Sequence, residues 1–151
     1  MTLGFSRIKK ATAGRSGARG KNKTMGKNFD AWNELKKELD GDAITAFAYP
    51  REIWWCSLGV NIGAEIDGKN ENFERPVIVM KVYNKETLLI LPITSRQKDD
   101  PFHHKIQTKQ KTVWVKLTQP RIISNKRLLR KVDVLGENEF EALRTRWKDS
   151  L

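Results

Sequence analysis

"REIWWCSLGVNIGAEIDGKNENFERPVIV", residues Arg51 to Val79, contains two short apolar runs separated by a long polar loop. Both runs are rich in aromatic or β-branched residues, which are typical of strands. The loop is rich in Gly, Asn and charge, with Glu65 towards its start and Arg75 at its end. Loops on a rigid scaffold often carry binding and catalytic groups. The stretch therefore predicts two strands that present Glu65 and Arg75.

Other runs of the same kind extend this pattern into a sheet. The second strand continues as RPVIVMKV, and TLLILPI (87–93) and TVWVKL (112–117) follow it. The connections YNKE (83–86) and KQK (109–111) are short enough for hairpins. We therefore expect an antiparallel meander rather than βαβ crossovers, in a small curled sheet or barrel. The predicted fold class is mainly β, within α+β.

Two segments show the apolar spacing of amphipathic helices. FDAWNELKKELD (29–40) predicts an N-terminal helix that packs on the domain. ENEFEALRTRWKDSL (137–151) predicts a C-terminal helix that starts with acids suited to a first turn. NKRLLRKV, from Asn125, indicates a further short helical turn. The apolar stripes of the two helices are Phe29, Trp32, Leu35 and Leu39, and Phe140, Leu143, Trp147 and Leu151.

The length of 151 residues fits one compact domain plus a tail. No apolar run reaches the roughly 20 residues of a membrane-spanning helix, and no signal-peptide core follows the N-terminus. The lone Cys56 fits a small buried hydrophobe in a reducing compartment. We expect a cytoplasmic protein without a membrane partner. Its predicted parts are a flexible basic tail (1–28), a helix and linker (29–48) and a main domain (49–151).

Positive charge is concentrated in the tail. Residues 1–28 hold eight of the 29 Lys and Arg residues and none of the 18 acids. Such a segment attracts phosphate, because neutralising a nucleic-acid backbone releases condensed counterions. A solubilising tail is an equally good interpretation.

Two sites at strand ends carry groups that bind phosphate. Arg75 precedes Pro76 at the mouth of the second strand, and PITSR ends the third with Thr94, Ser95 and Arg96. Guanidinium and hydroxyl groups both donate to phosphate oxygens. Taken alone, Arg75 also fits one half of a surface ion pair, and the two hydroxyls also fit a turn that satisfies its own backbone.

Two further segments give weaker signals. Adjacent residues of a strand point to opposite faces, so His103 and His104 do not converge on one ion, and we expect no metal site. LTQPRIISNKRLLRK (117–131) interleaves basic and apolar residues. It fits either an RNA contact or a solvated helical face.

Five segments between Arg51 and Leu151 form an ordered set. They are REIWWCSLG, Gly63-Ala64-Glu65 with Gly68, RPVIV, PITSR, and QPRIIS with KRL, followed by a terminal amphipathic helix. In order and spacing this set resembles the MazF/PemK family of toxin endoribonucleases. The resemblance implies an SH3-like or CcdB-like curled sheet, and a homodimer whose interface groove takes single-stranded RNA. It also implies neutralisation by a cognate antitoxin protein.

The resemblance further implies a reaction and a set of site residues. Family members cleave RNA without a metal or another cofactor, by attack of the ribose 2′-OH on the neighbouring phosphorus. The products carry a 2′,3′-cyclic phosphate and a 5′-OH. The implied catalytic residues are Arg75 for charge stabilisation, Thr94 for holding the phosphate, and Glu65 for orienting Arg75 or accepting the 2′-OH proton, with orientation preferred. The implied RNA-binding residues are Ser95, Arg96, Lys116, Thr118, Gln119 and Arg121.

The sequence departs from the PemK-type pattern at two places. Ala64 stands where some relatives carry a histidine, and Thr118 stands where they carry an acid before QPR. KNENFE also lengthens the loop before Arg75. Two alternatives therefore stay open: a catalytically degenerate member that binds RNA or antitoxin, and a CcdB-like toxin that binds gyrase, because a fold does not specify one function.

Overall fold

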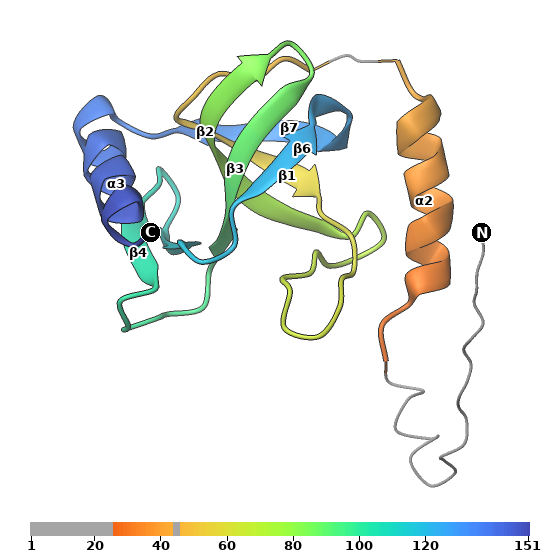
Figure 1. The fold of residues 1–151 in the computed structure, drawn as a ribbon, viewed down its shortest axis with the longest axis horizontal. Coiled ribbons are helices and arrows are strands. Elements are labelled where there is room, and N and C mark those ends of the chain that lie inside the picture. The colour runs from red at the N-terminus through yellow and green to blue at the C-terminus, as the bar shows by residue number, and fades with distance from the viewer. Residues whose placement is uncertain (1–25, 44–45) are drawn as a thin grey trace, which may run out of the picture.

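The computed structural model describes residues 26–43 and 46–151, which form a curled antiparallel sheet with a helix on either side (Figure 1). Helices α2 and α3 cover Phe29–Gly41 and Glu137–Asp149, and a 3₁₀ turn, η2, covers Asn125–Arg127. The strands are β1 (Glu52–Ser57), β2 (Glu74–Asn84), β3 (Thr87–Thr94), β4 (His103–Gln107), β5 (Thr112–Lys116), β6 (Arg121–Ser124) and β7 (Leu128–Val134).

The strand order explains how the sheet curls. It runs β4-β5-β3-β2-β1-β7, and β6 pairs with β3 beside this path. The predicted meander is confirmed for β1 to β3, and the predicted hairpin is confirmed for β4 and β5. The meander does not continue to the end of the chain, because β7 returns to pair with β1. The sheet is curled but not closed, and the expected antiparallel α+β fold is confirmed.

Three strands were not predicted from the sequence. In β4 only His103 and Ile106 are buried, so its apolar alternation is weak. β6 lies within residues 117–131 and β7 begins there, so the interpretation of that segment as a solvated helical face is wrong. The helical turn expected from Asn125 is confirmed only as η2. Pairing with β3 and β1 supplies the backbone partners here, and such tertiary context outweighs a weak local pattern.

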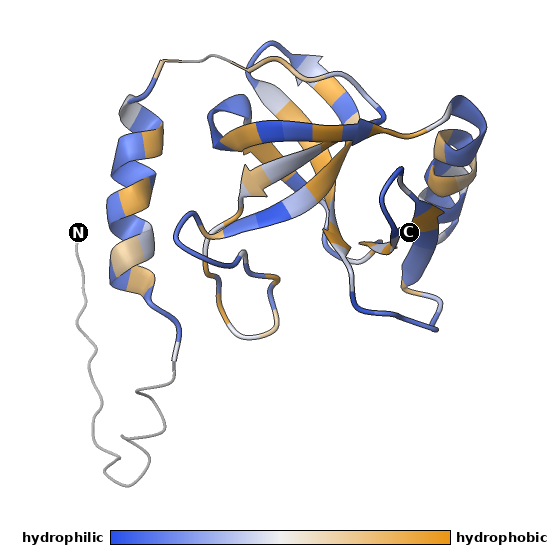
Figure 2. Cartoon of the chain, turned by 180° about the vertical axis from the view of Figure 1, so that it is seen from behind, coloured by the Kyte–Doolittle hydropathy of each residue, from blue (hydrophilic) through white to orange (hydrophobic). Residues whose placement is uncertain are grey.

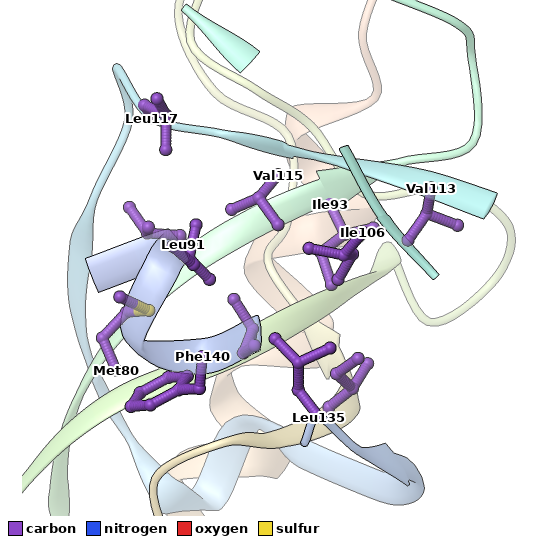
Figure 3. Close-up of a cluster of buried hydrophobic side chains, with 12 residues drawn as sticks. Met80, Leu91, Ile93, Ile106, Val113, Val115, Leu117, Leu135 and Phe140 are labelled. Atoms are coloured by element: carbon purple, nitrogen blue, oxygen red, sulfur yellow. The ribbon is translucent and has the colours of Figure 1, made fainter. Parts of the chain in front are cut away.

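The sheet buries apolar residues on both faces. In β2, the run Val77–Met80 is buried throughout, because alternate residues enter two different clusters. Ile78 and Met80 belong to the cluster that packs against α3 (Figure 3). Val77 belongs to the opposite cluster, together with Cys56. Burial raises the pKa of the Cys56 thiol to about 12, which agrees with the predicted inert, buried cysteine.

Helix α3 covers one end of the sheet. Phe140 and Leu143 are buried against it, as predicted, and Trp147 is half-buried. The prediction for Leu151 is wrong: this residue is 84% exposed, because the helix ends at Asp149. Figure 2 shows apolar and polar residues alternating along α2 and α3. Neither α2 nor α3, nor any other helix in the described part of the chain, is long and apolar enough to cross a membrane.

Helix α2 packs on the domain mainly through Trp32, and Lys126 donates to its Asp40 carbonyl. The side chain of Asn28 caps its first turn, and Trp32 is the only buried residue of its predicted stripe. The Trp32 indole lies over Gly59 and 5.5 Å from the Phe73 ring, measured between centroids. A Cβ at Gly59 would lie 2.2 Å from the indole, and φ is +88° there. Glycine is therefore required where α2 meets the loop after β1.

Candidate functional site

A groove of about 800 Å³ opens between the β1–β2 loop, residues 58–73, and the ends of β2, β3 and β5. Glu74 is the only acid among its described lining residues, and its carboxylate is paired with Arg130 at 3.0 Å. The groove is therefore strongly positive. Six of the nine predicted site residues line it: Arg75, Thr94, Ser95, Arg96, Lys116 and Gln119.

Backbone oxygens hold Arg75 at the edge of the sheet. Its Nε donates to the carbonyl of Asp67 at 2.6 Å, and one Nη donates to the carbonyl of Ile93 at 3.1 Å. Burial lowers the pKa of Arg75, and the negative charge of Asp67 opposes that shift. A guanidinium has five N–H groups, and within the described residues only two of them are used. The others can serve an anion in the groove.

Thr94 lies beside Arg75. Val77 pairs with Pro92 in antiparallel β2 and β3. Arg75, two residues before Val77, and Thr94, two residues after Pro92, therefore reach the same end of the two strands. The Thr94 hydroxyl accepts a hydrogen bond from the Arg96 amide at 3.2 Å. The turn interpretation is therefore correct for this oxygen. Its hydroxyl proton can still be donated to a phosphate, because accepting and donating use different parts of the group.

Glu65 does not lie with Arg75. It lines a second hollow of about 560 Å³, and its carboxylate accepts from the Ile62 amide at 3.0 Å. The residues that orient Arg75 in this structure are instead Asp67 and Ile93. Ala64, one of the two departures, lines both hollows.

Gln119 and Arg121 are used to hold the β1–β2 loop. The Gln119 side chain accepts from the Ile66 amide at 2.7 Å and donates to the Ala64 carbonyl at 3.2 Å. Arg121 lines the second hollow and donates to the Leu58 carbonyl at 3.2 Å. Thr118, the other departure, is exposed in the turn after β5 and lines neither hollow.

The β1–β2 loop is also held from outside the sheet. Lys27 forms a salt bridge with Asp67 at 3.1 Å and donates to the carbonyls of Asn61 and Gly63. Asp67 is the residue whose carbonyl holds Arg75. Lys27 belongs to the predicted tail, of which residues 1–25 lie outside the described residues. Within residues 26–28 of that tail, Lys27 and Asn28 make defined contacts.

A second set of groups reaches Lys116 from the opposite wall. His103 Nε2 lies 3.1 Å from Lys116 Nζ, and His103 Nδ1 lies 2.8 Å from an Asp100 carboxylate oxygen. Burial lowers the pKa of Lys116, as do the charges of Lys98 and Arg75. Among these residues, the sequence pattern singled out His103, as one of two adjacent histidines, but neither Asp100 nor Lys98. The spacing of these residues along the sequence does not predict the contacts of His103 with Lys116 and Asp100.

His104 has different neighbours, which confirms that the two histidines face apart. Its Nδ1 lies 3.5 Å from an Arg146 nitrogen on α3, and burial lowers its pKa. Within residues 26–43 and 46–151, no group of three or more His, Cys, Asp or Glu side chains is arranged to hold a metal ion.

Comparisons with solved structures identify similar folds. MazF from Deinococcus radiodurans has the same fold, with a TM-score of 0.59 and 18% identity over 70% of this chain and 97% of its own. A mycobacterial endoribonuclease, determined in complex with its cognate antitoxin, gives a TM-score of 0.54 at 9% identity, over 68% of this chain and 93% of its own. The Mycobacterium tuberculosis toxin MazF-mt6 gives a TM-score of 0.51 at 15% identity, over 66% of this chain and 95% of its own.

Sequence comparison supplies the family. No curated protein sequence matches the chain significantly. A family model for the PemK-like, MazF-like toxin of type II toxin–antitoxin systems matches residues 49–151, which include the whole sheet, both walls of the groove and α3. The chain therefore belongs to the PemK-like, MazF-like family of type II toxin–antitoxin toxins.

Proposed function

We propose that this protein is a toxin that cleaves single-stranded RNA as a metal-independent, sequence-specific endoribonuclease. The observation that carries the proposal is Arg75, held at the edge of a positive groove with three N–H groups unused within the described residues and with Thr94 beside it. Family membership supports the same activity, since two of the similar solved structures are described as endoribonucleases.

Arg75 and Thr94 suit the charge that develops in this reaction. When a ribose 2′-OH attacks the adjacent phosphorus, negative charge grows on the nonbridging oxygens. Donors fixed in advance around those oxygens stabilise the transition state most, because they need no reorganisation during the reaction. The guanidinium meets this requirement, with the Thr94 and Ser95 hydroxyls holding the same phosphate. The products then carry a 2′,3′-cyclic phosphate and a 5′-OH.

The path of the RNA accounts for the remaining predicted residues. Ala64, Ile66 and Gln119 line both hollows, so a strand that crosses this ridge reaches from Arg75 to Glu65 and Arg121. Backbone carbonyls already orient Arg75, which leaves Glu65 the alternative role of accepting the 2′-OH proton. Arg96 and Lys116 bind flanking phosphates. The exposed Thr118 contacts the RNA outside the two hollows.

The positive groove also suits a protein partner. Two of the similar structures are described as complexes with an antitoxin: the mycobacterial endoribonuclease, and MazE-MazF from Deinococcus radiodurans. An acidic antitoxin segment that occupies the groove would exclude RNA by competing for Arg75 and its neighbours. We propose that the protein acts in the cytoplasm as a homodimer that a cognate antitoxin neutralises in this way.

The test is cleavage of a long unstructured RNA by the purified protein in excess EDTA, followed by mapping of the new ends. We expect discrete cuts with 5′-OH ends. Arg75→Ala should abolish them, whereas Arg144→Ala, a half-buried residue of α3 that pairs with Glu141, should not.

Failure would be equally informative. Intact RNA that nevertheless stays bound to the protein would overturn the enzymatic proposal and identify a degenerate member that binds without cutting. Ala64→His and Thr118→Asp would then test whether the two departures from the PemK-type pattern account for the loss.

A further inference from the structure

Three side chains form a continuous hydrogen-bonded chain that ends in the groove. An Asp100 carboxylate oxygen lies 2.8 Å from His103 Nδ1, and His103 Nε2 lies 3.1 Å from Lys116 Nζ. His103 is only 8% exposed, although it is an imidazole on a small protein. β4 and β5 create the contact, because His103 and Lys116 are direct partners in their register.

Donor and acceptor rules determine the protons of this chain. A Lys116 ammonium can only donate, so His103 Nε2 must accept and the ring proton must sit on Nδ1. That proton then points at Asp100, which as a carboxylate can only accept. The Asp100 side chain also accepts from the Phe102 amide at 2.9 Å, so its position is set independently. The chain has one consistent direction, from Lys116 through His103 to Asp100.

The charges that face Lys116 oppose one another. Lys98, from the β3–β4 segment (residues 95–102), and Arg75, from β2, disfavour its ammonium, and so does burial. Asp100, from the same segment as Lys98, favours it. The pKa of Lys116 is lowered as a result, and His103 on β4 is the group in direct contact. Among the other groove residues, Arg96 and Lys111 add positive charge and Glu74 adds a paired negative charge.

We propose that Asp100 and His103 are positioning residues that hold the Lys116 ammonium as the proton donor to the leaving 5′ oxygen. The inference rests on the proposed endoribonuclease function and adds a role for Lys116 beyond phosphate binding. As the 2′ oxygen forms its bond to phosphorus, the bond from phosphorus to the 5′ oxygen breaks, and that oxygen takes a proton from Lys116. The 2′-OH proton passes to Glu65, the acceptor proposed above, and from there to water, and the Lys116 amine regains a proton from solvent.

Arg75 and Lys116 then have separate tasks. A guanidinium is a poor acid, because its ordinary pKa lies above about 12. Stabilising charge needs no proton transfer, so Arg75 suits that task. A lysine that only bound phosphate would need no buried imidazole behind it, since a point charge on a flexible stem suffices.

The first experiment is the pH dependence of kcat and KM for RNA cleavage by the full chain. If Lys116 donates a proton, kcat falls as pH rises through its pKa. Because the Asp100 charge raises that pKa, Asp100→Asn should move this alkaline limb to lower pH, and should reduce kcat about tenfold with KM unchanged. Lys116→Arg keeps the positive charge that binds phosphate, so KM should stay unchanged. Its kcat should fall by about 100-fold or more and the limb should disappear.

Asp99→Asn is the matched control, since Asp99 is an exposed neighbour that carries the same charge. It should leave the limb in place. A limb that stays in place in Asp100→Asn, or that persists in Lys116→Arg, would overturn the inference. Thermal unfolding of each variant separates a loss of fold from a loss of proton transfer.

A second measurement does not depend on activity. Nitrogen-15 NMR of the resting protein should find His103 protonated at Nδ1 and not at Nε2. The titration of the Lys116 side chain should shift to lower pH in Asp100→Asn. A proton on Nε2 would overturn the positioning role even if RNA is cut. A wild-type protein that cuts no RNA would overturn the proposed function and the proton-transfer step together, and the tautomer would still decide whether the chain exists.

Discussion

Arg75 and Lys116 are the two cations that reach the groove from the sheet, and they are held in different ways. The oxygens on Arg75 belong to the backbone at Asp67 and Ile93. The partner of Lys116 is the His103 side chain, which is backed by Asp100. Backbone carbonyls cannot change charge, so these two contacts of Arg75 do not depend on pH. The Lys116 wall consists of titratable groups, so its properties can be tuned.

The two walls also differ in how their backbone is anchored. In the β1–β2 loop, the amides of Leu58 and Gly59 both donate to the Phe73 carbonyl, and Trp32 and Lys27 hold the loop from outside. In the β3–β4 segment, the Asp100 side chain contacts His103 at the start of β4, and the Phe102 carbonyl accepts from the Leu117 amide. The permanent charge of Arg75 is therefore held by backbone carbonyls, whereas Lys116 is held by side chains whose own charge can change.

The largest expected effect comes from changing the Arg75 wall. Arg75→Lys keeps the charge, but a lysine that bound both carbonyls would present one further N–H to the groove instead of three. Removing one such donor typically costs about 10²–10³ in rate, so we expect kcat to fall by that factor. Single-turnover cleavage of RNA is the measurement. Arg144→Lys is the control on α3. A full rate in Arg75→Lys would mean that charge alone suffices and that the backbone support is irrelevant.

The next effect tests the rigidity of the same wall. A Cβ at Gly68 would lie 1.8 Å from the Phe73 carbonyl oxygen, which is backbone and cannot move aside. Gly68→Ala should therefore reduce the free energy of unfolding by about 1–3 kcal/mol, the usual cost of overpacking, and displace the adjacent Asp67 carbonyl. Urea denaturation measures the first effect. Gly41→Ala, where a Cβ meets nothing within 4 Å, should leave stability equal or slightly higher.

A smaller effect is expected from undocking α2. Trp32→Ala removes the indole between Gly59 and Phe73, so the β1–β2 loop should open more often while the sheet stays folded. We expect amide hydrogen exchange in residues 58–73 to accelerate about tenfold, which corresponds to local opening rather than global unfolding. Asn33→Ala, an exposed position on the same helix, should leave exchange unchanged. Equal protection in Trp32→Ala would show that the loop needs no support from α2.

The smallest expected effect distinguishes the walls by pH. The hydrogen bond from His103 is the main reason that the pKa of Asp100 is lowered, and the Phe102 amide and the positive charge of Lys98 add to it. A carboxyl whose pKa is lowered on folding adds stability above its unfolded pKa, and that stability disappears as pH falls through the folded value. Wild type should therefore be slightly more stable than Asp100→Asn at pH 6.

At pH 2 the two proteins should converge. Urea midpoints at low salt provide the measurement, because screening weakens exposed pairs. Asp99→Asn should show no such convergence. A difference that persists unchanged into acid would mean that the Asp100 charge does not stabilise this wall.

Local patterns identified much of the fold because their periodicity is visible along the chain. The four predicted strands, the hairpin between β4 and β5, and the starts of α2 and α3 all agree with the structure. β4, β6 and β7 were missed, because partners far along the chain stabilise them. For example, β6 carries Ile123 inward but leaves Ile122 53% exposed. Few residues in such a strand carry the apolar alternation that a sequence pattern needs.

The sequence by itself determined the antiparallel sheet, the two helices and the family set that includes Arg75 and PITSR, because those signals depend on residue type and short spacing. Only the tertiary structure decided which groups meet in the groove. It placed Asp67 behind Arg75, moved Glu65 to the neighbouring hollow, and joined Asp100 through His103 to Lys116. The physical reason is that strand register and loop anchoring determine these contacts. Neither the register nor the anchoring can be predicted from the short sequence around the groups that meet.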